Sequence, residues 1–434
     1  MQRRSVSMLS TILVVSVFLS ACQNAAFDAS ISQEPASSLM TEYIPDLLAI
    51  ETVAATREAP IGTGRVRFAE NTDRLQPQQE QLLLNFIHLY YASLADLEVK
   101  DATALFAADA SEQAGINRIV WETMVGVRAM QESDLRLTGY SFELRVQTVI
   151  EAENGEVSIR AQEDFVQNFA AFPGVDSKGF GVVHIFTLTN TSDGWRLVSH
   201  RQADRLYGTI MGRRNGVGGS ASDINISSAQ ARQRRDDWLS ASREAVQGRG
   251  SQGNAHSEVT VGNEYNRAAA VSYAREWATA QRNPVWGVYD RLGGNCQNFV
   301  SQAILAGGVP MDYTAPAQWK WFGDTPSSAF TASGRAPAWT GVNEFLAYVR
   351  NNTGFGMVAI ADAPFYSGQP GDVIHMGMHG EWRHTVMITQ VIEDAQGNTV
   401  DYLIASNTAN LLDFPVSAYH YQEQMLIRIL GWNA

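Results

Sequence analysis

The stretch GGNCQNFVSQAILAGGVPM, residues 293–311, decides how the second half of the chain is interpreted. After Cys296, apolar residues recur at helical spacing, and glycine and proline then end the pattern. These residues are Phe299, Val300, Ala303 and Ile304, followed by Gly307, Gly308 and Pro310. The pattern predicts a helix that begins at or beside Cys296. Because unpaired N–H groups and the dipole at a helix start favour a thiolate, this position predicts a lowered pKa for the thiol.

The other cysteine, Cys22, ends an N-terminal signal pattern. A basic start precedes an apolar run over residues 8–19, which is too short to span a bilayer. Residues 19–22, LSAC, resemble the lipobox of bacterial lipoproteins. The resemblance implies a signal over residues 1–22, a lipid on Cys22, and an exported protein that this lipid anchors to a membrane of the cell envelope. Gln23 follows rather than Asp, which favours the outer membrane if the cell has two membranes.

Acylation of Cys22 leaves Cys296 without a partner for a structural disulfide. A single thiol outside the cytoplasm is exposed to oxidation. Its presence in this chain is therefore explained either by deep burial or by chemistry. The polar residues around Cys296 favour chemistry.

Length and composition predict two domains. A chain of 434 residues is too long for one ordinary core, and its formal charge of −13 argues against a nucleic-acid partner. Residues 23–44 are small and polar, which predicts a flexible tether. Composition then divides the remainder into a domain over 45–206, a Gly/Ser/Arg-rich linker over 207–262 and a domain over 263–434.

The first predicted domain begins with apolar residues at helical spacing between residues 76 and 109. Four segments with a period of two follow between residues 142 and 199, separated by turn signals. Helices followed by antiparallel strands predict an α+β domain. Over residues 76–205 this order resembles the cone fold of the nuclear-transport-factor-like family, in which a curved sheet wraps a helix.

The predicted linker contains one short helical pattern that Ser227 or Ser228 caps. Arginines outnumber acidic residues in this part of the chain, although the whole chain is acidic. Two interpretations remain open for the helix: a solvated linker, or a contact with an anionic surface of the envelope.

A thiol nucleophile needs an imidazole base. The histidines after Cys296 are His375, His379, His384 and His420. His384 lies at the start of a strand pattern, where a rigid backbone holds a base in place. A short strand that ends near His375 precedes it, and the next strand pattern ends at Asn407. His375 and His379 are four residues apart, but in a Gly- and Met-rich turn rather than on a helix, so no metal site and no cofactor are predicted.

Four segments of this half, GGNCQNFVSQAILAGGVPM, APAWTGVNEF, GDVIHM and EWRHTVMIT, are similar to the putative amidase domain family of the papain-like superfamily. The similarity covers residues 265–433. It implies a papain-like α+β domain, so that the expected fold class of the whole chain is α+β. It also implies that Cys296 is the nucleophile and His384 the base.

The same resemblance implies that Asn407 orients His384, with Asn410 and Asp413 as alternatives. Backbone N–H groups of Cys296 and Gln297 at the helix start are the expected oxyanion donors, and the Gln297 side chain is a further candidate.

The predicted function is therefore that of an exported, lipid-anchored cysteine amidase or peptidase, a hydrolase whose expected substrates are peptides, including those of cell-wall peptidoglycan. A catalytically silent module with the same fold that binds the envelope is the alternative. Transfer of the acyl group to an amine instead of water is a third possibility, since both reactions use the same thioester.

Overall fold

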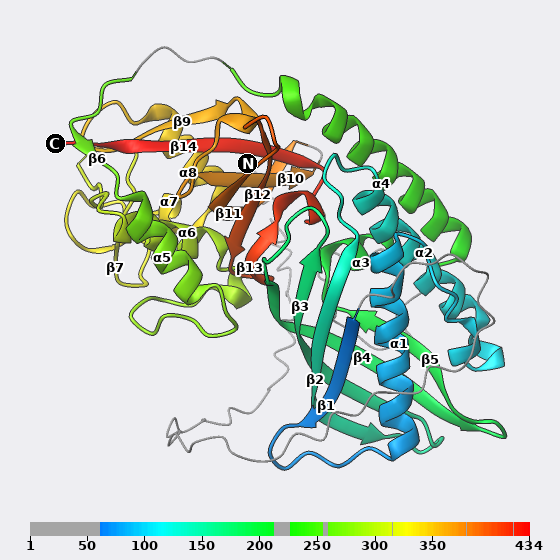
Figure 1. The fold of residues 1–434 in the computed structure, drawn as a ribbon. Coiled ribbons are helices and arrows are strands. Elements are labelled where there is room, and N and C mark those ends of the chain that lie inside the picture. The colour runs from blue at the N-terminus through cyan, green and yellow to red at the C-terminus, as the bar shows by residue number, and fades with distance from the viewer. Residues whose placement is uncertain (1–60, 212–225, 255–258, 315, 379, 420) are drawn as a thin grey trace, which may run out of the picture. The chain divides into compact units, whose positions relative to one another are not determined.

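One large sheet runs through both halves of the chain (Figure 1). The structure, a computed structural model, describes residues 61–211, 226–254, 259–314, 316–378, 380–419 and 421–434. The predicted signal, the predicted tether and Cys22 lie outside these residues. In order across the sheet, the strands are β1 (Ile61–Phe68), β2 (Leu137–Glu151), β3 (Val157–Phe169), β4 (Ser177–Thr191), β13 (Asn410–Pro415), β12 (Thr399–Ser406), β11 (Glu381–Glu393), β10 (Val373–Met378), β14 (Glu423–Asn433) and β6 (Asn263–Glu264).

Two further strands pair at the side of this order: β5 (Gly194–Gln202) with β4, and β9 (Gly356–Ala363) with β14. The pair β1 and β2 is parallel, and the other pairs of the large sheet are antiparallel. A separate small sheet consists of β7 (Trp321–Phe322) and β8 (Gly334–Arg335). The link between the halves is the antiparallel pair β4 and β13, in which Asn410 lies opposite Phe180.

The helices are α1 (Pro77–Asp96), α2 (Ser111–Ala129), α3 (Arg205–Ile210), α4 (Ser228–Gly248), α5 (Arg267–Trp277), α6 (Cys296–Ala306), α7 (Pro337–Thr340) and α8 (Val342–Asn351). α1 packs against β1, β2 and β5, while α5, α6 and α8 pack against β11. Among the described residues, no helix combines the length and the apolar character that crossing a bilayer requires.

Two apolar clusters lie on opposite faces of the C-terminal strands, as the alternation of side chains along a strand requires. On β11, Val386 and Ile388 belong to the cluster that also contains the core of the N-terminal strands and helices. Met387 belongs to the second cluster, together with Phe299 and Val300 of α6. α6 therefore covers the face of β11 from which Met387 projects.

The helix α4 has a buried face as well as a charged one. Ser227 caps it, because its hydroxyl accepts a hydrogen bond from the Gln230 N–H, and the capping box is complete. Ala231 and Trp238 are buried, and α4 packs along α2. The helix predicted for this segment is confirmed, and it is in contact with the N-terminal helices rather than fully solvated.

The predicted α+β class is confirmed: helices pack on a mostly antiparallel sheet. The four strands of period two are present as β2 to β5. Of the helical spacing expected over residues 76–109, α1 covers the first part, and only short 3-10 turns follow it before residue 111. The helix α2 and the strand β1 are not predicted from the sequence. The division into two domains and the cone-like resemblance remain predictions, since the strands of both segments share one sheet.

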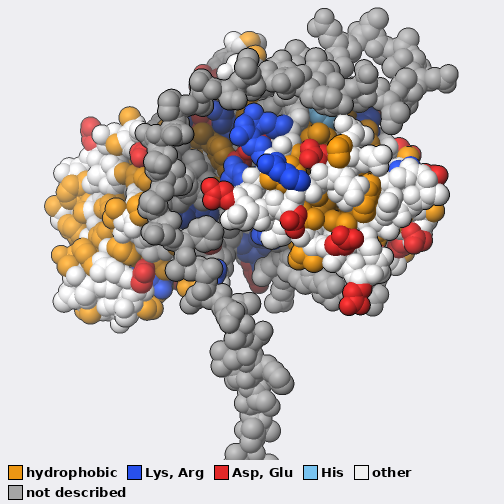
Figure 2. All heavy atoms as spheres, turned by 90° about the horizontal axis from the view of Figure 1, so that it is seen from below, with side chains coloured by type: hydrophobic (Ala, Val, Ile, Leu, Met, Phe, Trp, Pro, Cys, Tyr) orange, Lys and Arg blue, Asp and Glu red, His pale blue; other side chains and the backbone are white. Residues whose placement is uncertain are grey.

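On the face shown in Figure 2, Lys and Arg side chains gather near the middle, and Asp and Glu side chains are scattered around them.

Candidate active site

Cys296 is the first residue of α6, as the sequence predicts. Gly293 and Gly294 precede Asn295, the residue before the helix, with φ of 113° and 130°, values that only glycine adopts without strain. They turn the chain sharply into the helix. The side chain of Cys296 is buried, with 6% exposed, and the thiol is free. The backbone N–H groups of Thr385, Gln297 and Cys296 itself each act to lower the pKa of this thiol.

The N–H of Thr385 reaches the sulfur because of where the strands end. The pairing of β11 with β12 runs from Met387 opposite Ala405 to Glu393 opposite Thr399, so Thr385 lies beyond the end of that ladder. The Cys296 thiol interacts with the Thr385 N–H at this position. It thereby lies one residue along the backbone from His384.

The pKa of the Cys296 thiol is raised, not lowered as the sequence predicts. Burial raises it to about 11, and the three backbone N–H groups offset only part of this effect. The free energy needed to remove a thiolate from water is larger than the stabilisation that a helix start and its N–H groups give to the charge. In this conformation the nucleophile candidate is therefore a neutral thiol.

His384 lies on β11 and is 3% exposed. Its Nε2 is 2.9 Å from the Ser406 hydroxyl and 3.0 Å from the Tyr419 hydroxyl. The ring of Tyr421 stacks on the imidazole, with centroids 5.5 Å apart and planes at 9°. No partner of Nδ1 is found among the described residues. The two hydroxyl groups therefore fix one nitrogen of the ring and leave the other for chemistry.

The imidazole is neutral in this setting. Burial, together with the smaller effect of the positive charge of Arg205, lowers the pKa of His384 to about 3. The pKa of Tyr421 is raised to about 12, mainly by burial, and the charge of an ionised Cys296 is among the smaller effects that raise it, while Arg205 opposes them. Cys296, His384 and the two tyrosines thus form one electrostatically connected group.

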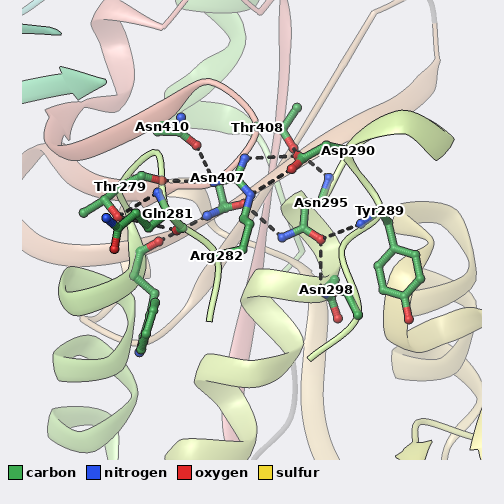
Figure 3. A network of polar contacts seen from close by, with 12 residues as sticks. Thr279, Gln281, Arg282, Tyr289, Asp290, Asn295, Asn298, Asn407, Thr408 and Asn410 are labelled. Carbon is green, nitrogen blue, oxygen red and sulfur yellow. Dashed lines mark hydrogen bonds and ion pairs between the residues drawn. The ribbon is translucent and has the colours of Figure 1, made fainter. Parts of the chain in front are cut away.

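Asn407 contacts residues near Cys296 rather than His384. Its Oδ1 accepts from Nδ2 of Asn295 at 3.0 Å, and its Nδ2 donates to the Trp277 carbonyl at 3.1 Å (Figure 3). The neighbouring Thr408 hydroxyl accepts from the Asn295 N–H at 2.6 Å. Within the part of the chain that the structure describes, Asn407 makes no hydrogen bond to His384. Its contacts hold the residue before Cys296.

The other two candidates for an orienting residue also lie away from the imidazole. Asn410 donates to the Phe180 carbonyl and accepts from Arg282, at 3.0 Å and 2.8 Å. Asp413 accepts from Thr389 at 2.6 Å and from Arg275 at 3.1 Å. These contacts join β13 to its neighbours.

Gln297 offers its backbone rather than its side chain. The side chain is fully buried, and its Nε2 donates to the Ser301 hydroxyl at 3.2 Å. The backbone N–H, in contrast, acts to lower the pKa of the Cys296 thiol and so lies near the sulfur.

His375 lies directly opposite Thr385 on β10. It is fully buried, and neither ring nitrogen has a hydrogen-bond partner among the described residues. Burial, together with the smaller effects of a protonated His384 and of Arg350, lowers its pKa to about 3. The described residues contain no cluster of three or more His, Cys, Asp or Glu that could hold a metal ion, and His379 and His420 lie outside them.

Sequence reasoning missed Ser406, Tyr419, Tyr421 and Arg205. Ser406 is the last residue of β12 and directly precedes Asn407, the orienting residue that the resemblance implies; the hydroxyl of Ser406 is the one that contacts His384. Tyr419 and Tyr421 have the spacing of one strand face, which was a usable signal. Arg205 gave no signal, because it comes from the other half of the chain.

Comparisons with known proteins agree with an amidase assignment for the C-terminal half. A family profile described as "Putative amidase domain" matches residues 264–430. The uncharacterized protein YhbB of Bacillus subtilis (strain 168) is 30% identical over 127 residues, which are 29% of this chain and 37% of that protein. The alignment thus spans just over a third of that relative's length. No solved structure gives a significant match.

Proposed function

We propose that this chain is a lipid-anchored cysteine amidase that hydrolyses amide bonds in peptides of the cell envelope. One observation carries the proposal: the thiol of Cys296 at the start of α6 interacts with the backbone N–H of Thr385, the residue after His384, and Nε2 of His384 is held by Ser406 and Tyr419. The match to an amidase profile over 264–430 supports amide bonds as the substrate class. The lipid on Cys22 and export follow from the sequence alone.

Because Cys296 and His384 are both neutral, the proposed mechanism transfers the proton during the attack. Nδ1 of His384 takes the thiol proton as the Cys296 sulfur attacks the amide carbonyl carbon, so that the thiolate forms during the attack. The backbone N–H groups of Cys296 and Gln297 then stabilise the oxyanion. His384 passes the proton to the leaving amine as the C–N bond breaks, which leaves a thioester on the sulfur.

Water completes the reaction. Nδ1 removes a proton from water as its oxygen attacks the thioester carbonyl, and the proton returns to the sulfur as the C–S bond breaks. The products are a carboxylic acid, an amine and the free thiol. An amine in place of water would give acyl transfer through the same thioester.

Asn407 has a different part in this proposal from the one that the resemblance implies. It holds Asn295, and so the turn that leads into Cys296, while Ser406 and Tyr419 hold the base. The nucleophile and the base are thus fixed by neighbouring residues of one strand end.

A catalytically silent module that binds the envelope is the second candidate, and one observation favours it. Burial raises the pKa of Cys296 to about 11, which is also the behaviour of an inert buried cysteine.

A digest of purified cell wall, analysed by mass spectrometry, separates the two functions. Wild-type protein should release fragments with new amine and carboxyl groups, and Cys296→Ser should reduce their rate of appearance by about 1000-fold or more, because the nucleophile is lost. Arg243→Ala, at an exposed position of α4, is the matched control and should keep the wild-type rate. Unchanged hydrolysis by Cys296→Ser would place catalysis elsewhere, and wall binding without release would favour the silent module.

A further inference from the structure

A chain of contacts links the N-terminal segment, which lies outside the residues of the family match, to His384. Tyr421 stacks on the imidazole of His384, and Tyr419 lies against both rings with centroids 5.4 Å from each. Arg205, at the start of α3, donates from its guanidinium to the Tyr421 hydroxyl at 3.0 Å. Its guanidinium carbon is also 4.8 Å from the centroid of the Tyr421 ring. A chain of contacts therefore runs from α3 to the imidazole.

The backbone around Arg205 is fixed on its own side. The Asp204 carboxylate caps α3 by accepting from the Tyr207 N–H at 3.0 Å. The Tyr207 hydroxyl in turn donates to the His200 carbonyl on β5. Because β5 belongs to the sheet, the position of Arg205 is set by the N-terminal strands.

The same sheet fixes this segment relative to the site. The Ser177 hydroxyl on β4 donates to the Asp413 carbonyl at 2.7 Å, and Asn410 donates to the Phe180 carbonyl at 3.0 Å. These bonds join β4 to β13, the strand that leads toward Tyr419 and Tyr421. The N-terminal segment is thus built onto the amidase half at the point where Arg205 is needed.

We propose that Arg205, which lies outside the amidase match, is a positioning residue of the active site and acts on His384 through Tyr421. The inference rests on the proposed function in taking His384 as the base. A guanidinium that both donates to the hydroxyl and lies over the ring restricts Tyr421 to one orientation. That orientation keeps the face of the imidazole covered and its plane fixed, and the nearby positive charge disfavours protonation of the base.

Several titratable or charged groups surround the imidazole. They are Cys296 on α6, His375 on β10, Tyr419 and Tyr421 before β14, Arg205 on α3, and Asp204, whose charge acts on both tyrosines. Arg205 is the cation among them whose charge acts directly on His384. Removing that charge alone should therefore raise the pKa of the imidazole, and restoring it with lysine should reverse the change.

The test compares Arg205→Met, Arg205→Lys and Tyr421→Phe in the full chain, with Arg232→Met at an exposed position of α4 as the matched control. The first readout is the pH profile of kcat/KM on the cell-wall peptide digest. Arg205→Met should lower kcat/KM about tenfold at pH 7 and move the acid limb to higher pH. Arg205→Lys should return the limb toward the wild-type position, and Tyr421→Phe should lower the rate without moving the limb. The control should match wild type in both.

The second readout is the ¹⁵N spectrum of the His384 ring, which needs no substrate. Its signals should shift in Arg205→Met and stay in place in Arg232→Met. An Arg205→Met protein that melts at a lower temperature but keeps the wild-type pH profile and ring signals would reduce Arg205 to a structural residue. Absence of hydrolysis in every variant and in wild type would defeat the proposed function, while the ring signals would still decide the role of Arg205.

Discussion

Two opposing effects act on the Cys296 sulfur. The helix start supplies N–H groups that favour a thiolate, and burial removes the water that would stabilise the charge. Burial prevails, since the pKa rises to about 11. His384, with a pKa lowered to about 3, is also neutral. We therefore expect Cys296 to transfer its proton to His384 during the attack, rather than to form a thiolate–imidazolium ion pair beforehand.

At the residue scale, the hydroxyl groups on Nε2 of His384 should be partly interchangeable. Ser406→Ala or Tyr419→Phe alone removes one of two neutral hydrogen bonds, worth about 1 kcal/mol each, and should lower kcat/KM by about 10-fold or less. The double variant should lower kcat/KM by more than the product of the two single effects, because no hydroxyl group then binds Nε2 of the ring. Steady-state kinetics measure this.

The matched control is Tyr402→Phe. Tyr402 lies on the same strand as Ser406, and its buried hydroxyl donates to the Phe365 carbonyl at 2.7 Å. The variant should cost stability but leave kcat/KM unchanged. A double variant with wild-type kinetics would contradict the assignment of Ser406 and Tyr419 as the residues that hold the base.

At the scale of elements, an ion pair ties α5 to the strands that carry the site. Arg267, the first residue of α5, donates to Asp372 at 2.7 Å and to the Ile429 carbonyl at 2.6 Å. Asp372 precedes β10 and is fully buried, and its Oδ1 also accepts from the Ile429 N–H at 2.9 Å. The pair thereby fixes the starts of α5 and β10 against β14.

Arg267→Met should lower the free energy of unfolding by about 3 kcal/mol, because it leaves the Asp372 carboxylate buried without its closest cation. Arg65→Met removes a pair of which the arginine side chain is 54% exposed and should cost about 1 kcal/mol or less. Urea unfolding followed by tryptophan fluorescence compares the two. Equal losses would mean that the buried pair does not fix these elements.

At the scale of the whole molecule, local patterns could be predicted and long-range contacts could not. The period after Cys296 and the closing glycines located α6, and alternation located β11 and β12. One hydroxyl at Nε2 of His384 belongs to Ser406, the residue before Asn407, which the resemblance implies as the orienting residue. The raised pKa of Cys296 and the contact from Arg205 depend on which segments bury the site, and sequence spacing carries no information on that.

Buried histidines should make the whole molecule sensitive to acid. His375 and His384 have folded pKa values of about 3, below the value near 6.5 of an unfolded chain. As pH falls below about 6.5, the unfolded state binds protons first, so stability is fully present above that pH and is lost toward pH 3. Each histidine should contribute a slope of up to about 1.4 kcal/mol per pH unit in this window.

Urea unfolding at several pH values between 7 and 4 measures this slope. His375→Leu should reduce it by about 1.4 kcal/mol per pH unit, while stability at pH 7 stays the same or rises, because the ring nitrogens have no partner among the described residues. A slope unchanged by His375→Leu would contradict the neutral, buried state of this ring.

The most direct test of the central claim is the rate at which iodoacetamide alkylates Cys296 at pH 7, in a Cys22→Ser background where it is the single thiol. If His384 takes the thiol proton during attack, His384→Ala should lower this rate by about 10-fold or more, and only at a pH near 11 should the two proteins react alike. Equal rates at pH 7, with or without the imidazole, would show that thiol and base do not work together and would contradict the account.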